Sequence, residues 1–551
     1  APRSTSSSSN VCLAAFTTGV AGATAALARR RGPPRQRRWA VATSTVPAVQ
    51  APQVDREAWE RGYDSAYQEQ CYTVECADLP GDLVGTYFRN GPAKFLVGND
   101  EICHPFDGDG MVAALTFDGK GKVHFRNRFV RTPGFVKELE AQEMLYRGTF
   151  SRKPGGMLRN LGELGGDKNV ANTNVMYWGG KLLALWEGSK PTSLDPLSLA
   201  TEGEDTMEGS LEAGDRFCAH PRYDPATGRM VGFQNKPGPQ GTKLTFWEFE
   251  AGSFEVHSRI EAEAPGFGFY HDFLVTENYY IMSKGPVDLD LSEVFKGFLG
   301  MQSIGESMKF LKDKPGMFIL VPRDGSKTQV IEVDPHFTFH FANGFEDVDG
   351  RVVVDMASAP ELALGDTQAD VPVWRTVNFE EMPKSHLWRY TLKPGSSDWT
   401  REEICDSYLD FTSVPDEKKG RTYRYTYCLT STCAASPMHK LLKVDMVDLS
   451  QKVWTPEPYE FLGEPLFVAK KGAQAGDAED DGYVVSILLN GRTKTTEFLV
   501  FHADDVEKGP LCRVPLPTYL PHALHGTWTP EFVPSQAEIE EAWSKVPTSL
   551  G

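Results

Sequence analysis

The chain has 551 residues and a mass of 61.1 kDa, which is long for one domain but within the range of large all-β proteins. Residues 1–54 hold seven arginines and no acidic residue, so the remainder sets 50 basic residues against 75 acidic ones, a net charge of −25. This acidic body argues against a nucleic-acid partner, which needs Lys and Arg to neutralise phosphates. The nine cysteines include no CxxC pair, so neither a thiolate zinc site nor a disulfide framework is indicated.

The first 54 residues differ in composition from the rest of the chain. Ser4–Ser9 is rich in serine, Leu13–Ala28 is an apolar run, and Arg29–Arg31 begins a basic stretch. Segments rich in Arg and Ser and free of acidic residues are typical of organellar transit peptides. The apolar run is shorter than the roughly 18 residues of a spanning helix, although a signal-like core or the stop-transfer element of a bipartite plastid leader stays open. We expect residues 1–54 to be a disordered plastid-targeting leader and residues 55–551 to be one domain.

The remaining sequence predicts an all-β protein with few helices. Helices are expected at Asp55–Gln70, Leu291–Leu311 and Ser535–Lys545. From about residue 84 to 502, short runs of Val, Ile, Phe, Tyr and Thr alternate with DG, GG and NG pairs, which are hairpin signals. So many short antiparallel strands favour a β-propeller over a single sandwich. No clean repeat is visible, so the number of blades does not follow from these residues.

The segment Asp288–Leu311 stands out because apolar residues dominate it. It is interpreted in two ways: as an exposed patch that contacts a membrane surface peripherally, or as a helix that covers the core. No segment after the leader is apolar enough to span a membrane.

Four histidines have unusually apolar or aromatic neighbours. They are His220 in FCAHPRYD, His271 in GFGFYHDF, His340 in FTFHFANGFED and His525 in PHALHGTW. Neutral imidazole is the commonest protein ligand for transition metals. A histidine beside aromatic residues is more often an ordinary core residue, and the spacing of these four matches no metal motif. The flanking residues make them candidates for one buried metal site.

These flanks, in this order, resemble the four ligand motifs of the carotenoid cleavage oxygenase family, also called retinal pigment epithelial membrane protein-like. The resemblance spans roughly residues 55–535, and the stretch from Phe267 to Gly325 is most similar to the apocarotenoid-cleaving branch. Further matching motifs are GTYFRNGPAKF (85–95), HPFDGDGM (104–111), NVANTNV (169–175), LLALWEGSKPTSLDP (182–196) and GEPLFV (463–468).

The resemblance implies a seven-bladed β-propeller with a helical and loop dome and a non-haem Fe(II) on the propeller axis. It makes the four histidines the iron ligands. Four neutral imidazoles leave the 2+ charge uncompensated in the ligand set and leave positions free for O₂. No general acid or base is expected if the metal and O₂ carry the chemistry.

Carboxylates are expected to orient three of the imidazole rings by accepting their second N–H. The positions that match the family are Glu187 in LWEGS, Asp410 in YLDFTS and Glu464 in GEPLF. Asp410 departs from the usual glutamate of the family. Because Asp is one methylene shorter, we expect a closer backbone, a strained bond or a bridging water there.

Three further residues match the family's substrate tunnel. Thr173 corresponds to a threonine that restricts access to an open iron position, and Trp186 and Phe269 correspond to aromatic residues of the tunnel wall. Ordinary core packing is the other interpretation of the two aromatic residues.

The resemblance implies an Fe(II)-dependent dioxygenase that cleaves a C=C bond of a carotenoid or apocarotenoid to aldehyde or ketone products, such as retinal-type aldehydes. Family motifs describe the metal centre and not the tunnel, so cleavage of a stilbene and isomerisation of a polyene stay open. More distant alternatives are a non-catalytic propeller that binds protein or pigment, and a hydrolytic zinc site. A zinc site fits poorly because the ligand set holds no carboxylate.

Overall fold

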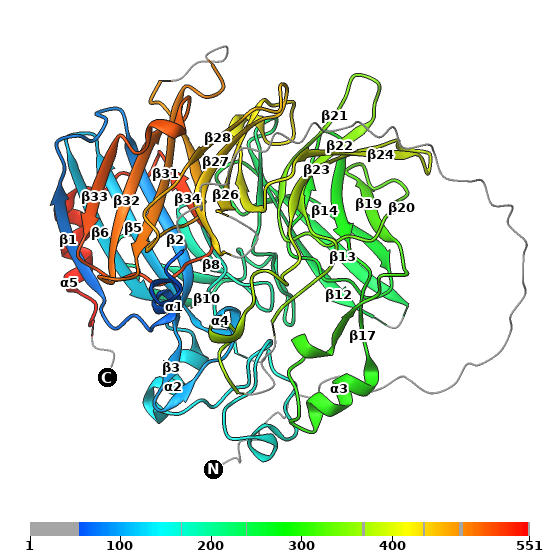
Figure 1. The fold of residues 1–551 in the computed structure, drawn as a ribbon, viewed down its shortest axis with the longest axis horizontal. Helices are drawn as coiled ribbons and strands as arrows, with labels where there is room; N and C mark the ends of the chain where they lie inside the picture. The colour runs from blue at the N-terminus through cyan, green and yellow to red at the C-terminus, as the bar shows by residue number, and fades with distance from the viewer. Residues whose placement is uncertain are drawn as a thin grey trace, which may run out of the picture. The chain divides into compact units, whose positions relative to one another are not determined.

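The computed structural model describes residues 54–548 except 167, 239, 366–369, 433–435 and 473–477. The predicted leader, residues 1–54, therefore lies outside the described residues apart from Val54. The structure is built mainly of antiparallel β-sheets, to which short helices are added (Figure 1).

Seven sheets of four or five strands follow one another along the described part of the chain. From the central to the outer strand, they have the following composition. The first contains β34 (Gly526–Thr529), β2 (Val84–Lys94), β5 (Asp109–Asp118), β6 (Lys122–Phe129) and β1 (Gln70–Glu75). The second contains β7 (Asn174–Trp178), β8 (Lys181–Leu185), β9 (Thr192–Leu194) and β10 (Thr201–Glu204). The third contains β11 (Arg222–Asp224), β12 (Arg229–Pro237), β13 (Gly241–Phe249) and β14 (Val256–Pro265).

The other four sheets repeat this plan. The fourth contains β15 (Leu274–Val275), β16 (Tyr279–Lys284), β19 (Gly316–Pro322) and β20 (Gln329–Val333). The fifth contains β21 (Phe341–Glu346), β22 (Val352–Ser358), β23 (His386–Leu392) and β24 (Trp399–Cys405). The sixth contains β25 (Leu409–Ser413), β26 (Tyr425–Ser431), β27 (Met438–Asp445) and β28 (Gln451–Trp454). The seventh contains β29 (Glu460–Leu462) and β30 (Leu466–Ala469), both paired with β31 (Gly482–Asn490), then β32 (Thr495–His502) and β33 (Cys512–Leu516).

The central strands of neighbouring sheets touch. β34 contacts β7 and β30, β15 contacts β11 and β21, and β21 contacts β25. The last strand of the chain, β34, pairs with β2 near its start, with Arg89 opposite Gly526 and Thr86 opposite Thr529. This pairing closes the ring of sheets without a covalent bond. The protein is a seven-bladed β-propeller, which confirms the predicted fold class and the blade number that the family resemblance implied.

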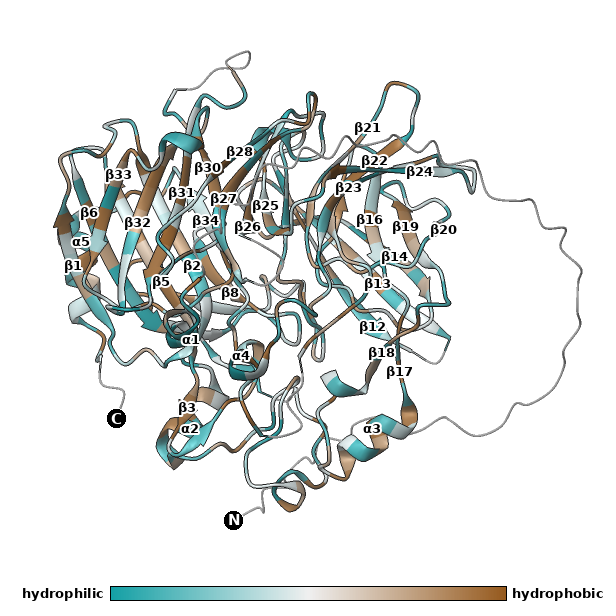
Figure 2. Cartoon of the chain, in the orientation of Figure 1, coloured by the Kyte–Doolittle hydropathy of each residue, from teal (hydrophilic) through white to brown (hydrophobic). Residues whose placement is uncertain are grey.

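Strands in the middle of a blade are covered by the neighbouring blades on both faces, so they are apolar along most of their length. β31, with the sequence GYVVSILLN, is buried at every residue but the last. Figure 2 shows β31 and β32 dominated by hydrophobic residues. Burial on both faces also explains why simple alternation of polar and apolar residues does not mark these strands.

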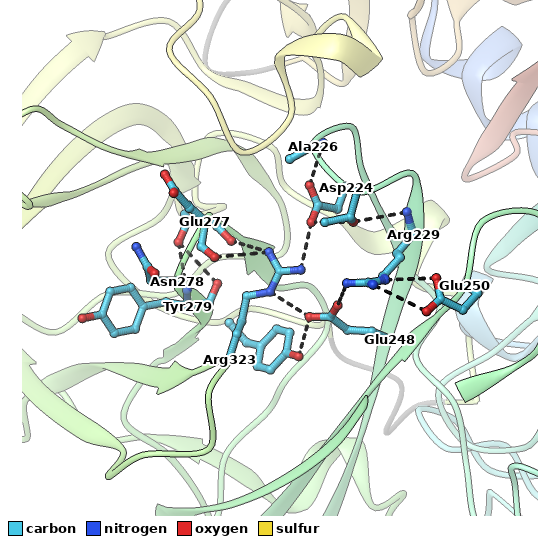
Figure 3. Close-up of polar contacts among 12 residues, drawn as sticks. Asp224, Ala226, Arg229, Glu248, Glu250, Glu277, Asn278, Tyr279 and Arg323 are labelled. Atoms are coloured by element: carbon cyan, nitrogen blue, oxygen red, sulfur yellow. Dashed lines mark hydrogen bonds and ion pairs between the residues drawn. The ribbon is translucent and has the colours of Figure 1, made fainter. Parts of the chain in front are cut away.

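Polar side chains join the third and fourth blades at a buried point (Figure 3). The Arg323 guanidinium donates to Glu248 at 2.7 Å and to Asp224 at 2.9 Å, and the Tyr280 hydroxyl donates to the same glutamate at 2.7 Å. A buried carboxylate needs such partners because desolvation of an unpaired charge is costly. The network joins two blades that also share a large apolar cluster.

Two of the three predicted helices are shorter than expected. The predicted helix Asp55–Gln70 is only α1 (Arg56–Glu60) followed by a short 3₁₀ turn. The predicted helix Leu291–Leu311 ends early: α3 covers Leu291–Phe298, and the segment then continues as a 3₁₀ turn and β18 (Met308–Phe310), which pairs with β17 (Val287–Leu289). A run rich in Gly and Ser, GMQSIGES, follows α3 and favours turns over a continued helix.

The predicted C-terminal helix is α5 (Gln536–Ser544), which begins at a capping box formed by Ser535 and Glu538. The sequence did not predict α2 (Pro133–Ala141) or α4 (Val373–Thr376). In Figure 1, α2, α3, α4 and the small sheet of β3 (Leu96–Val97) and β4 (Asp100–Glu101) lie on one side of the propeller sheets. The seven described cysteines are all free thiols.

Candidate metal centre

Each of the four candidate histidines lies just before the central strand of a blade. His220 precedes β11, His271 precedes β15, His340 precedes β21 and His525 precedes β34. The central strands of a propeller surround its axis, so residues at the same end of these strands meet there. Residues that are hundreds of positions apart in sequence therefore converge on one point.

The imidazole nitrogens are spaced as ligands of a single metal ion. The Nε2 atoms of His220 and His271 lie 2.9 Å apart, those of His271 and His340 3.3 Å, and those of His340 and His525 3.1 Å. An imidazole–metal bond of about 2.1 Å places two ligands at right angles roughly 3 Å apart. All four donor atoms lie within 4.8 Å of one another. The donor set consists of nitrogen alone and fits a transition metal.

Three carboxylates hold the other nitrogen of three of these rings. Glu187 pairs with His271 Nδ1, Asp410 Oδ1 lies 2.6 Å from His340 Nδ1, and Glu464 Oε1 lies 2.7 Å from His525 Nδ1. A carboxylate that accepts the Nδ1 proton fixes the tautomer and directs a free Nε2 toward the metal. Within the described residues, no carboxylate bonds to the His220 ring.

Burial and neighbouring charges shift the pKa values of these groups in different directions. Burial, and then the three neighbouring imidazoles, lower the pKa of His220 well below its usual range. Burial also lowers the pKa of His525, against the opposing effect of Glu464. For His340, burial is outweighed by the Asp410 carboxylate, which raises the pKa. His220, the ring without a carboxylate partner, is thus held neutral.

Asp410 reaches its histidine directly, although its side chain is one methylene shorter than the glutamate expected from the family. The bond to His340 is direct, and Oδ1 of the same carboxylate also accepts the N–H of Phe411 at 2.8 Å. The pairing of β25 with β26 is irregular between Asp410 and Ser413, and Phe411 has a positive φ of 55°. Of the three expectations for this position, a bridging water is therefore not needed.

The candidate tunnel residues line a cavity of about 720 Å³ that also exposes ligand residues. Thr173, Trp186 and Phe269 all lie on its wall, together with His271, His340 and His525. Thr173 is buried, and its hydroxyl donates to Asn172 at 3.1 Å. Many other wall residues are apolar or aromatic, among them Phe106, Phe337, Phe379 and Met438.

Sequence reasoning missed two aromatic residues that contact the ligands. The ring centroids of Phe339 and His271 lie 5.5 Å apart. The Phe411 centroid lies 5.2 Å from the ring centroids of both His340 and His525. Phe339 stands next to His340 in FTFHF, and Phe411 stands next to Asp410 in YLDF. Their adjacency to predicted site residues was the available signal.

Comparison with known proteins assigns the chain to a family. Residues 63–530 match the retinal pigment epithelial membrane protein family. The chain belongs to this family. Proteins of this family have a metal centre, and the four histidines of this chain could bind a metal.

Relatives within this family act on different substrates according to their names. The chain is 38% identical to apocarotenoid-15,15'-oxygenase of Synechocystis over 482 residues, 85% of this chain and 96% of that protein. It is 27% identical to lignostilbene-alpha,beta-dioxygenase isozyme III of Sphingomonas paucimobilis, over 82% of this chain and 92% of that protein. It is 24% identical to the chloroplastic carotenoid cleavage dioxygenase 7 of rice, over 82% of this chain and 87% of that protein.

Solved structures of family members share the fold. The cobalt-substituted apocarotenoid oxygenase of Synechocystis superposes with a TM-score of 0.81 at 36% identity, covering 86% of this chain and 99% of that chain.

Replacing Asp410 tests whether its carboxylate supports metal binding. We predict that Asp410→Asn weakens binding of a divalent transition metal by about 10- to 100-fold, because a neutral amide holds the His340 N–H less strongly. Titration of the metal-free protein with cobalt(II) measures the affinity. Asp406→Asn, at an exposed acid of the same segment, is the control and should bind as the wild type does. Equal affinity of the two variants would contradict this role.

Proposed function

We propose that this protein is a non-haem Fe(II) oxygenase that cleaves a C=C bond of a carotenoid or apocarotenoid with O₂ and releases two carbonyl products. The convergence of four histidines, three of which line a cavity with many apolar and aromatic side chains, carries the proposal. His220, His271, His340 and His525 are assigned as the iron ligands. Glu187, Asp410 and Glu464 are assigned as the carboxylates that orient three of them.

The choice of iron rests on the ligand set and on the relatives. Imidazole ligands suit zinc, copper, nickel and iron alike, so nitrogen donors alone do not choose. The family relatives named above are oxygenases, and a metal that activates O₂ must be able to change oxidation state, which excludes zinc. When bound, iron would supply this activation, with coordination positions left free by the four histidines.

The protein's own residues bind and orient the substrate. The cavity wall offers aromatic and apolar side chains, among them Trp186, Phe269 and Phe339, which fit a long conjugated hydrocarbon and exclude water. Thr173 limits the space beside the metal. No side chain acts as general acid or base in this proposal, because oxygen chemistry at a metal does not require one.

A stilbene-type substrate is the second candidate, because relatives named for lignostilbene and resveratrol match at 27% identity. The higher identity to an apocarotenoid oxygenase favours the polyene.

Product analysis separates these candidates. Iron-loaded protein incubated with O₂ and an apocarotenal, β-carotene or a stilbene should give two carbonyl fragments from a polyene. His340→Ala should lower the rate at least about 100-fold, because it removes a ligand. His257→Ala is the control: its imidazole also pairs with a glutamate, at 2.7 Å, but on the surface.

Three results would contradict the proposal. A preference for the stilbene would support the second candidate, and polyene isomerisation without uptake of O₂ would support an isomerase. A protein that takes up no stoichiometric iron and cleaves nothing would support a non-catalytic propeller.

We further propose that the segment 288–311 contacts a membrane surface, from which an apolar substrate is taken. The helix α3 is amphipathic, yet apolar residues on it face solvent: Leu291 is 69% exposed and Phe295 is 61% exposed. Leu158, 81% exposed, extends the patch, since the backbone near it is hydrogen-bonded to α3 through Gly162 N and Phe298 O at 2.9 Å. Leu289, Ile304 and Met308 of the same segment line the cavity. Among the described residues, no helix is long and apolar enough to cross a membrane.

Vesicle flotation tests this surface. Phe295→Asp should lower binding to phosphatidylcholine vesicles at least about tenfold, because inserting a phenyl ring contributes about 1.5–3 kcal/mol. Val447→Asp is the matched control at a valine that is 70% exposed on another part of the surface. Equal binding of both variants and the wild type would exclude membrane contact at this segment.

We also propose that residues 1–54 direct the protein to a plastid and that residues 55–551 form the enzyme. The composition of the first 54 residues supports this. A fluorescent protein fused behind residues 1–54 should enter plastids, and replacing Arg29–Arg31 with glutamate should reduce its import. A fusion that stays cytosolic would contradict the proposal.

A further inference from the structure

The Asp272 side chain lies beside the four histidines but is not among their direct partners. It follows His271 immediately, just before β15, and it is buried. We propose that Asp272 is a positioning residue that sets the spacing of three of the four histidines. This inference rests on the proposed metal-binding function.

One carboxylate joins three different blades. Its Oδ1 accepts the N–H of Phe273 at 2.7 Å, and its Oδ2 accepts the N–H of Phe341 at 3.0 Å. The Arg222 guanidinium pairs with Oδ2 and also donates from Nε to the Phe273 carbonyl at 2.8 Å. Phe341 follows His340, and Arg222 stands two residues after His220. The contacts of Asp272 therefore lie within two residues of His220, His271 and His340.

Both oxygens of Asp272 accept hydrogen bonds from these donors, so the side chain positions the neighbouring segments and is not a fifth metal ligand. The group of side chains whose donor atoms converge contains the four histidines without Asp272. The contacts with Phe341 and Arg222 run between blades and oppose sliding of one central strand against the next.

A metal site whose ligands come from separate sheets needs directional bonds that fix the sheets relative to one another. Productive ligand geometry requires placement within about 0.5 Å, whereas blades that meet through apolar side chains can shift without breaking a directional bond. A buried ion pair contributes little net stability because desolvation offsets its attraction. The buried Asp272–Arg222 pair, with side chains 1% and 16% exposed, is therefore better explained by positioning than by stability.

Asp272→Asn, compared with a matched control, tests the inference in the full-length protein. Asp355 is the control because it is also buried and bonded to an arginine, Arg389, at 2.8 Å through each of two nitrogens, but it lies in the second strand of the fifth blade. Cobalt(II) affinity, the visible spectrum of the cobalt(II) protein and the unfolding temperature of the metal-free protein are measured for each variant.

The inference predicts that Asp272→Asn weakens cobalt(II) binding about 10- to 100-fold and changes the visible spectrum. Asp355→Asn should keep the cobalt(II) affinity within about twofold of the wild type and keep the spectrum, even if its unfolding temperature falls as much as that of Asp272→Asn. Wild-type affinity and spectrum in Asp272→Asn, or an equal loss of affinity in both variants, would overturn the inference.

Two further outcomes are informative. If Asp272→Asn does not fold, Arg222→Gln replaces it. This change keeps the two backbone N–H bonds to Asp272 and removes the contacts of the guanidinium with Asp272 and with the Phe273 carbonyl. It should weaken cobalt(II) binding about tenfold, and unchanged binding would overturn the inference. If the wild type itself binds neither cobalt(II) nor Fe(II), both the proposed function and the role of Asp272 are contradicted. If the wild type binds metal and Asp272→Asn binds it equally well, only the role of Asp272 is contradicted.

Discussion

Closure of the propeller ring by β34 is the constraint on which the metal centre depends. β34 is the last strand of the chain, and its pairing with β2 brings His525 to the axis. The backbone carbonyl of His525 accepts the N–H of Asn90 at 2.9 Å, while Glu464 of the seventh blade accepts both His525 Nδ1–H and the N–H of Gly526. The bonds that join the two ends of the domain are therefore also the bonds that place the fourth ligand. Ring closure and completion of the ligand set are one structural event.

Charge explains the rest of the centre. Three carboxylates, of which Asp410 and Glu464 are buried and Glu187 is partly exposed, stand one imidazole away from the point on which the Nε2 atoms converge, so a dication there would be compensated without direct carboxylate ligands. Burial alone would raise the pKa of Glu187 and of Glu464, but their histidine partners bring both below the ordinary value. The carboxylates are thus held ionised in an apolar cavity where an isolated acid would become protonated. Because the carboxylates contact the rings and not the point of convergence, a bound metal would meet only imidazole nitrogens and would keep positions free on its cavity side.

Much of this could be predicted because the site residues carry distinctive neighbours. The aromatic flanks of His340 and the run LLALWEG around Glu187 reflect buried strands: the central strand β21 follows His340, and the second strand β8 ends just before Glu187. The strand pattern alone did not reveal the blade number, because the blades share a shape and no repeated sequence, and strands buried on both faces lack alternation. The number seven was predicted from the family resemblance of the motifs. Leu291–Leu311 was wrongly predicted to be one helix because its apolar residues lie on a short helix, a turn and a strand that together form a surface. Asp272 was overlooked in the motif YHDF because its role exists only across blades, in contacts with Arg222 and Phe341 that no local pattern records.

The central claim is that four histidines from four blades bind one iron ion. Crystallography of the anaerobically Fe(II)-loaded protein, with anomalous scattering recorded at the iron edge, tests it most directly. The account predicts one anomalous peak bonded to Nε2 of His220, His271, His340 and His525, with Glu187, Asp410 and Glu464 on the far side of three rings. Iron bound elsewhere, or coordinated directly by one of these carboxylates in place of a histidine, would contradict it.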